Sequence, residues 1–174
     1  MHQKHILVNL LKKIPHDISG IEIGVYEGIT SAYLLEHLDN LKKLYCVDSW
    51  ELYEDYTKTL RSDGPMAGNL NIVFETYKNN IHIYKDRVKT FKMMSAEAVK
   101  HISDESVYFV FIDANHAYEY VKNDILLWMP KVEIGGLIIG HDYGKERFGV
   151  TKAVHEIFGN NFKTNGSVWH TTRR

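Results

Sequence analysis

The stretch VYFVFIDANHAYEYVKNDILLWMPKVEIGGLIIGHDY, residues 107–143, indicates the fold class of this chain. Its first part, 107–112, is a short apolar run rich in β-branched and aromatic side chains, as a parallel strand buried on both faces requires. Residues 118–129 then carry apolar side chains at helical spacing and end before a proline. A Gly-Gly turn leads into a second apolar run at 137–140. The pattern predicts a strand, a helix and a second strand of one parallel sheet.

Polar side chains follow both of these strands at the point where each is expected to end. Asp113 follows the first strand, and His141 with Asp142 follows the second. Because the carboxyl ends of parallel strands share one edge of the sheet, and open α/β sheets bind ligands at that edge, these three side chains are expected to converge.

The amino-terminal half repeats the same pattern with glycines at its first turn. Residues 20–25 predict a short strand, Gly24 and Gly28 frame a turn, and residues 30–38 predict a helix. A second strand at 44–48 ends in a carboxylate. A strand, a glycine-bearing turn, a helix and an acidic strand end are typical of a nucleotide-binding half.

The other segments complete a single domain over residues 1–174. An amphipathic helix at 3–14, within the segment 1–15, is expected to pack across the sheet. Residues 49–68 lack a clear pattern and predict a lid or substrate-binding loop. The remaining patterns predict helices at 70–77, 95–101 and 149–158, a third strand at 81–84 or, as we prefer, at 88–93, and a hairpin of 162–164 with 168–171 around Asn165-Gly166.

The composition excludes several classes of protein. The net charge of -1 and the pI near 6.8 give no electrostatic footprint for a nucleic acid or an anionic membrane. No apolar run approaches the ~20 residues of a membrane span. The single cysteine, Cys46, excludes an internal disulfide and fits a reducing compartment, so a cytoplasmic protein is expected.

Taken together, five segments resemble class I S-adenosylmethionine-dependent methyltransferases, and most closely the small bacterial methyltransferase-24 group. The resemblance covers most of the chain in the expected order. It implies a Rossmann-like, doubly wound α/β fold, with a mostly parallel seven-stranded sheet of order 3-2-1-4-5-7-6 and helices on both faces. The segments are IEIGVYEGITS (21–31), LYCVDSW (44–50), MMSAEA (93–98), FIDANHAYEYVKNDILLWMPKVEIGGLIIGHDY (111–143) and GVTKAVHEIF (149–158).

The resemblance also implies a binding site for S-adenosylmethionine. Glu22 and Gly24 would border the methionine moiety, and Asp48 would receive the ribose hydroxyls, since a carboxylate is a natural bidentate acceptor for a vicinal diol. Other residues that the resemblance or their position places at the cofactor are Tyr26, Ser49, Trp50, Ser95, Ala96 and Asp113. Tyr26 stands where the usual first-loop pattern has a glycine.

A second likeness is to metal-dependent catechol-type and sugar O-methyltransferases, which hold a divalent cation at the ends of the fourth and fifth strands. Here Asp113, His141 and Asp142 either bind a cation such as Mg²⁺ or Mn²⁺, with His141 shifting preference away from Mg²⁺, or hydrogen-bond to one another. His116 stands where those relatives carry a catalytic lysine. Its ordinary pKa near 6.5 suits a general base, so we predict His116 as the base. Asp113, the second predicted catalytic residue, would act with His141 and Asp142 as a ligand of the metal or of the acceptor hydroxyl.

Three functions are compatible with these residues. The leading prediction is O-methylation of a small hydroxylated molecule, such as a sugar or a secondary metabolite. The alternatives are a nicotinamide-dependent oxidoreductase, although GVYEG is a poor dinucleotide fingerprint, and a cofactor-binding relative without catalysis. The acceptor pocket is expected to use residues 49–68 and 143–149, within one chain or with the neighbouring subunit of a homodimer.

Overall fold

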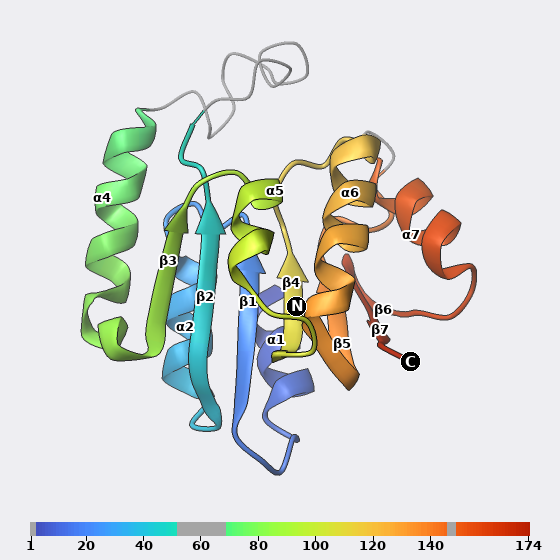
Figure 1. Ribbon diagram of the computed structural model, residues 1–174, viewed down its shortest axis with the longest axis horizontal. Coiled ribbons are helices and arrows are strands. Elements are labelled where there is room, and N and C mark those ends of the chain that lie inside the picture. Colours follow the sequence, from blue (N-terminus) through green and yellow to red (C-terminus); the bar gives the residue numbers. More distant parts are fainter. Residues whose placement is uncertain (1–2, 52–68, 146–148) are drawn as a thin grey trace.

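The chain folds around a seven-stranded sheet of order β3-β2-β1-β4-β5-β7-β6, as shown in Figure 1. The computed structural model describes residues 3–51, 69–145 and 149–174. The first five strands are parallel, and β7 pairs antiparallel with both β5 and β6. The predicted fold class and strand order are therefore confirmed. The strands are β1 (Ile18–Ile23), β2 (Leu41–Asp48), β3 (Val88–Lys92), β4 (Val107–Ile112), β5 (Val132–Gly140), β6 (Lys163–Asn165) and β7 (Val168–Thr172).

Helices cover both faces of this sheet. Figure 1 shows α5 and α6 in front of the sheet and α1 and α2 behind it. One helix layer contains α1 (Gln3–Leu11), α2 (Ile29–His37) and α4 (Leu70–Ile81), and the other contains α5 (Ser95–Ala98), η3 (Val99–His101), α6 (Tyr118–Trp128), η4 (Met129–Lys131) and α7 (Val150–Phe158). In the described part of the chain, no helix combines the length and the apolar character that crossing a membrane requires.

Successive side chains of the central strands point to opposite faces of the sheet, which explains why a helix layer covers each face. On β4, Phe109 and Phe111 join the core beneath α1, α2 and α4, whereas Val110 and Ile112 join the core beneath α6 and α7. All four side chains are buried. A strand that is apolar on both faces can be stable only between two helix layers, which is why the apolar runs of the sequence predicted a parallel sheet.

Two local predictions from the sequence need correction. The pair Gly135-Gly136 lies inside β5 and is not a turn before it. A Cβ atom on Gly136 would lie 2.3 Å from the carbonyl oxygen of Tyr108, so glycine lets β5 approach β4 where their register shifts. The first helix ends at Leu11, before residue 14. The third strand is at 88–92, as preferred, because residues 82–87 form a 3-10 helix.

Candidate cofactor-binding and catalytic site

The first loop and the loop after β4 meet at the carboxyl edge of the sheet. Gly24 follows β1 with a φ of 84°, and its N–H donates to the carbonyl oxygen of Val47 at 2.9 Å. A Cβ atom on residue 24 would lie 2.3 Å from the carbonyl oxygen of Asp113. Only glycine permits this approach, so the contact between the two loops depends on Gly24.

Asp48 organises the first loop through its side chain. Its Oδ2 atom accepts hydrogen bonds from the backbone N–H groups of Val25 and Tyr26, both at 2.9 Å, and its Oδ1 atom accepts one from Trp50 N–H at 2.8 Å. A carboxylate offers about four lone-pair sites, so about one remains, on Oδ1. The bidentate diol contact expected from the sequence does not fit this arrangement, whereas a single contact through Oδ1 does.

Tyr26 and Trp50 both adopt left-handed backbone conformations, with φ angles of 53° and 49°. The indole N–H of Trp50 donates to the carbonyl oxygen of Tyr26 at 2.8 Å. The indole ring itself is buried against Phe74 and Tyr77, with ring centroids 4.6 and 4.8 Å away. Trp50 therefore links the hydrophobic core to the first loop. Ser49, also buried, accepts a hydrogen bond from Glu51 N–H through its Oγ atom at 3.2 Å.

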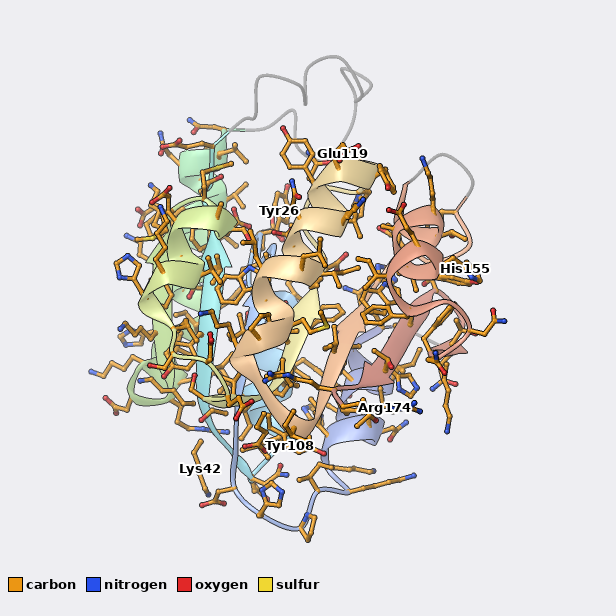
Figure 2. The ribbon with its side chains drawn as sticks, turned by 45° about the vertical axis from the view of Figure 1, so that its right-hand side comes forward. Tyr26, Lys42, Tyr108, Glu119, His155 and Arg174 are labelled. Carbon is orange, nitrogen blue, oxygen red and sulfur yellow. The ribbon has the colours of Figure 1, made fainter. Side chains whose placement is uncertain are left out.

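Tyr26 lies at the edge of the sheet where the predicted site residues gather. Figure 2 shows Tyr26 and Glu119 toward one end of the molecule and Lys42 and Tyr108, which belong to the first parts of β2 and β4, toward the other. The tyrosine is thus on the carboxyl edge of the sheet.

Glu22 is buried in β1, and it accepts a hydrogen bond from the Ser31 hydroxyl of α2. Burial raises the pKa of Glu22 from 4.5 to about 8; the Ser31 hydroxyl opposes this shift, and the charges of Asp113 and Asp48 add to it. The carboxyl group is consequently protonated for the most part at neutral pH. A cationic ligand at this edge would favour its ionised form.

Ser95 and Ala96 begin α5, after β3. The Ser95 hydroxyl donates to Asp124 Oδ1 at 2.5 Å and accepts from the indole N–H of Trp128 at 2.7 Å. Burial raises the pKa of Asp124 to about 6, although the Ser95 hydroxyl opposes this shift. Because the Ser95 side chain is engaged in this network, any contact it makes with an adenine ring must come mainly from its backbone. Ala96 is exposed at the surface.

Asp113, His141 and Asp142 converge as expected. One ligand atom from each lies within 4.8 Å of the others. His141 Nδ1 is 3.4 Å from Asp113 Oδ1 and 3.3 Å from Asp142 Oδ1, close to the ~3 Å between neighbouring ligands of a small divalent cation. His141 Nε2 is held by the Ser167 hydroxyl at 2.8 Å, which fixes the ring orientation. The donor set and its support therefore fit a divalent cation.

His116 belongs to the same cluster, and its surroundings change its acid–base behaviour. Its Nε2 atom lies 2.6 Å from Asp142 Oδ2 and 3.7 Å from Asp113 Oδ1. Burial would lower the pKa of His116, but the two carboxylates outweigh it and raise the pKa from 6.5 to about 9. The imidazole thus carries a proton at neutral pH. The ordinary pKa on which the predicted base role relied does not hold here.

Asp142 lies within ion-pair distance of His116, His141 and Lys145. Its backbone is left-handed, with a φ of 59°, and Lys145 contacts its Oδ1 atom. Burial would raise the pKa of Asp142, but His116, Lys145 and His141 lower it well below its usual range. A cation bound here would compete with Lys145 for this carboxylate.

Gln3 is a site residue that the sequence did not indicate. It begins α1, and its side-chain amide donates to Asp113 Oδ2 at 2.8 Å. The amphipathic pattern of residues 3–14 predicted a packing helix, but no local signal links residue 3 to a strand end 110 positions away. Residues 52–68 of the predicted lid and residues 146–148 of the other acceptor segment lie outside the described residues.

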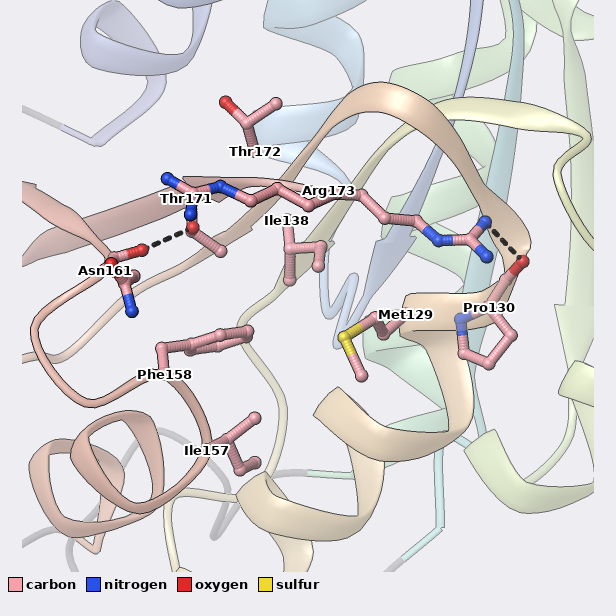
Figure 3. Close-up of a pocket in the computed structure, with 10 residues that line it drawn as sticks. Met129, Pro130, Ile138, Ile157, Phe158, Asn161, Thr171, Thr172 and Arg173 are labelled. Carbon is pink, nitrogen blue, oxygen red and sulfur yellow. Dashed lines mark hydrogen bonds between the residues drawn. The ribbon is translucent and has the colours of Figure 1, made fainter.

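A separate cavity of about 410 Å³ lies toward the opposite edge, between the ends of α6 and α7 (Figure 3). Phe158, Ile157 and Met129 supply apolar walls. Arg173 crosses the cavity, and its guanidinium donates to the carbonyl oxygen of Pro130 at 3.0 Å and pairs with a carboxylate of a neighbouring turn. None of the site residues predicted from the sequence lines this cavity.

A Rossmann-like sheet with its last strand inserted antiparallel beside β5, and with its polar residues gathered at the carboxyl edge, is the architecture of methyltransferases. The chain belongs to that class: residues 21–143 match a family described as a methyltransferase domain, the methyltransferase-24 group. An uncharacterized protein of Acanthamoeba polyphaga mimivirus is 30% identical over 161 residues, which cover 88% of this chain. The chain spans only 65% of the length of that relative.

Solved structures share the fold at low sequence identity. The O-methyltransferase NovP has a TM-score of 0.71 and 18% identity, with 98% of this chain and 79% of NovP covered. An O-methyltransferase from Bacillus cereus in complex with SAH has a TM-score of 0.68 and 16% identity, with 98% and 80% covered. A precorrin 8w decarboxylase from Methanobacterium thermoautotrophicum has a TM-score of 0.61 and 15% identity, with 95% and 75% covered. At these identities, the likeness concerns the fold alone.

Proposed function

We propose that this protein transfers the methyl group of S-adenosylmethionine to a hydroxyl oxygen of a small molecule. The observation that carries the proposal is the position of two clusters on adjacent strand ends. The first loop, held by Asp48, follows β1, and the cluster of Asp113, His141 and Asp142 follows the neighbouring strands β4 and β5. A cofactor in the first loop would place its methyl group beside groups able to bind a hydroxyl.

The cofactor side of this edge suits a positively charged nucleoside. Glu22, Asp48 and Asp113 bring three carboxyl groups together, and the charges of Asp113 and Asp48 both add to the raised pKa of Glu22. When bound, S-adenosylmethionine would supply an activated methyl group on a sulfonium. Asp48 would accept one ribose hydroxyl through Oδ1, and Gly24 would border the methionine moiety, its missing Cβ leaving room for the backbone of Asp113.

The acceptor side would orient the hydroxyl and remove its proton. Methyl transfer needs in-line positioning, exclusion of water and a base. Asp113, His141 and Asp142 would hold a divalent cation, which would polarise the acceptor oxygen. We keep His116 as the proposed base, with one added condition. The condition is that the charges of its carboxylate partners are offset, as a cation held by Asp113 and Asp142 would do, so that the pKa of His116 would fall towards neutral pH.

Calorimetric titration tests this proposal. The protein is titrated with S-adenosylmethionine, S-adenosylhomocysteine and NAD, each with and without Mn²⁺ or Mg²⁺. We expect micromolar binding of the two sulfur nucleosides and none of NAD. Binding of NAD alone would favour an oxidoreductase, and binding of none of the three would overturn the proposal.

A variant that keeps all three proposed ligands tests whether the cluster of Asp113, His141 and Asp142 binds a metal. Ser167→Ala removes the hydroxyl that holds His141 Nε2 but leaves all three proposed ligands in place. We expect it to weaken Mn²⁺ binding about tenfold or more while cofactor affinity is unchanged. Equal Mn²⁺ affinity in the variant and the wild type would show that the Ser167 hydroxyl does not support a metal ligand.

A further inference from the structure

Two residues at the first loop have backbone conformations that side chains disfavour. Tyr26 and Trp50 are left-handed, although neither is glycine, and both N–H groups point to the carboxylate of Asp48. Residues with a Cβ atom avoid this conformation because the Cβ crowds the backbone. Such conformations persist only where the surroundings hold them, and they are concentrated at functional sites.

The restraint on Tyr26 comes from two sides. Asp48 binds its N–H at 2.9 Å, and the indole N–H of Trp50 binds its carbonyl oxygen at 2.8 Å. Trp50 is 4% exposed and its indole packs against Phe74 and Tyr77, so the donor cannot move away without disturbing the core. Both peptide groups of Tyr26 are thereby held by hydrogen bonds, one of them from a buried donor.

We propose that Trp50 is a positioning residue for cofactor binding, because its indole N–H holds Tyr26 in the left-handed conformation that shapes the first loop. The inference deepens the proposed function and rests on it. The hydrogen bond from the indole of Trp50 would hold the first loop in its binding conformation before the cofactor arrives. This bond is needed because residue 26 carries a Cβ atom, which disfavours the left-handed conformation. A glycine at residue 26 would adopt the same conformation without help.

The test compares the effect of one substitution in three backgrounds. Trp50→Phe keeps an aromatic ring but removes the indole donor. It is made in the wild type, in Tyr26→Gly and in Tyr26→Ala, and S-adenosylhomocysteine affinity is measured by calorimetry. The glycine and alanine backgrounds both lack the phenol ring and differ only in the Cβ atom. Tyr77→Phe, which loses a hydrogen bond to Thr90 in the same aromatic cluster, controls for damage to the core.

We expect Trp50→Phe to weaken binding about tenfold in the wild type and in Tyr26→Ala, but by less than about twofold in Tyr26→Gly. Tyr77→Phe should bind as the wild type does. An equal loss in all three backgrounds, or no loss in the wild type, would overturn the inference while leaving the proposed function intact. Failure of the wild-type protein to bind S-adenosylhomocysteine would overturn both.

Discussion

Gly24 shows how closely the first loop and the loop after β4 must approach each other at the carboxyl edge of the sheet. A Cβ atom on this residue would lie 2.3 Å from the carbonyl oxygen of Asp113 and 2.6 Å from the Cα atom of Ala114. Ordinary contact needs about 3.5 Å, so Gly24→Ala must separate the loops by about 1 Å. Overpacking of this kind costs about 2 kcal/mol, and the left-handed conformation costs an alanine about 1 kcal/mol more. We expect the free energy of unfolding to fall by about 3 kcal/mol.

Gly135→Ala is the matched control. Gly135 has nearly the same φ, 88° against 84°, but among the described residues no atom beyond its chain neighbours lies within 4 Å of the new Cβ. Gly135→Ala should lower the free energy of unfolding only by the cost of the left-handed conformation, about 1 kcal/mol. Urea unfolding followed by tryptophan fluorescence and circular dichroism gives both values. If the two variants lose equal stability, the close contact between Gly24 and the β4 loop does not affect the free energy of unfolding, and the predicted packing cost is refuted.

Three further predictions concern other parts of the molecule. Asp124→Asn should stabilise the protein by about 3 kcal/mol at pH 8 and have no effect below pH 4: the pKa is raised from 3.8 to about 6 on folding, so the wild type loses stability as pH rises from the unfolded pKa through the folded one. Urea unfolding across pH checks this, and a constant difference would contradict it. Arg87→Lys should cost about 2 kcal/mol in the same assay, because the guanidinium donates to the carbonyl oxygens of Leu35, Leu38 and Leu41, which one ammonium cannot reach together; unchanged stability would refute it. His116→Gln should lower methyl transfer about 10²-fold while S-adenosylhomocysteine affinity stays within about twofold, and full activity would end the proposed base role.

Much of the fold could be predicted because burial on both faces leaves a visible pattern. The apolar runs of β2 and β4 predicted central parallel strands, and the polar residues after them marked the ligand edge. The pair Gly135-Gly136 was misread because glycine marks close backbone approach as well as turns, and only the register of β5 against β4 distinguishes the two.

The details of the candidate site were harder to predict from the sequence, for a different physical reason. The partners of Asp48 are backbone N–H groups, whose directions follow from the φ angles of Tyr26 and Trp50 and not from their side chains. The pKa of His116 likewise depends on distances to carboxylates that no spacing rule supplies. Sequence can name the residues that meet at a strand edge, but their hydrogen-bond capacity there has to be counted in three dimensions.

The insertion of β7 between β5 and β6 has a consequence for how the protein is made. On the ribosome, β1 to β5 emerge first and can begin to pair while the hairpin is still unsynthesised. Ser167 reaches His141 only when β7 adds to β5, where Tyr143 N–H also bonds to the Ser167 carbonyl oxygen. A nascent chain would therefore form the first loop early and complete the cluster of Asp113, His141 and Asp142 last, which would delay the proposed methyl transfer until the sheet is finished.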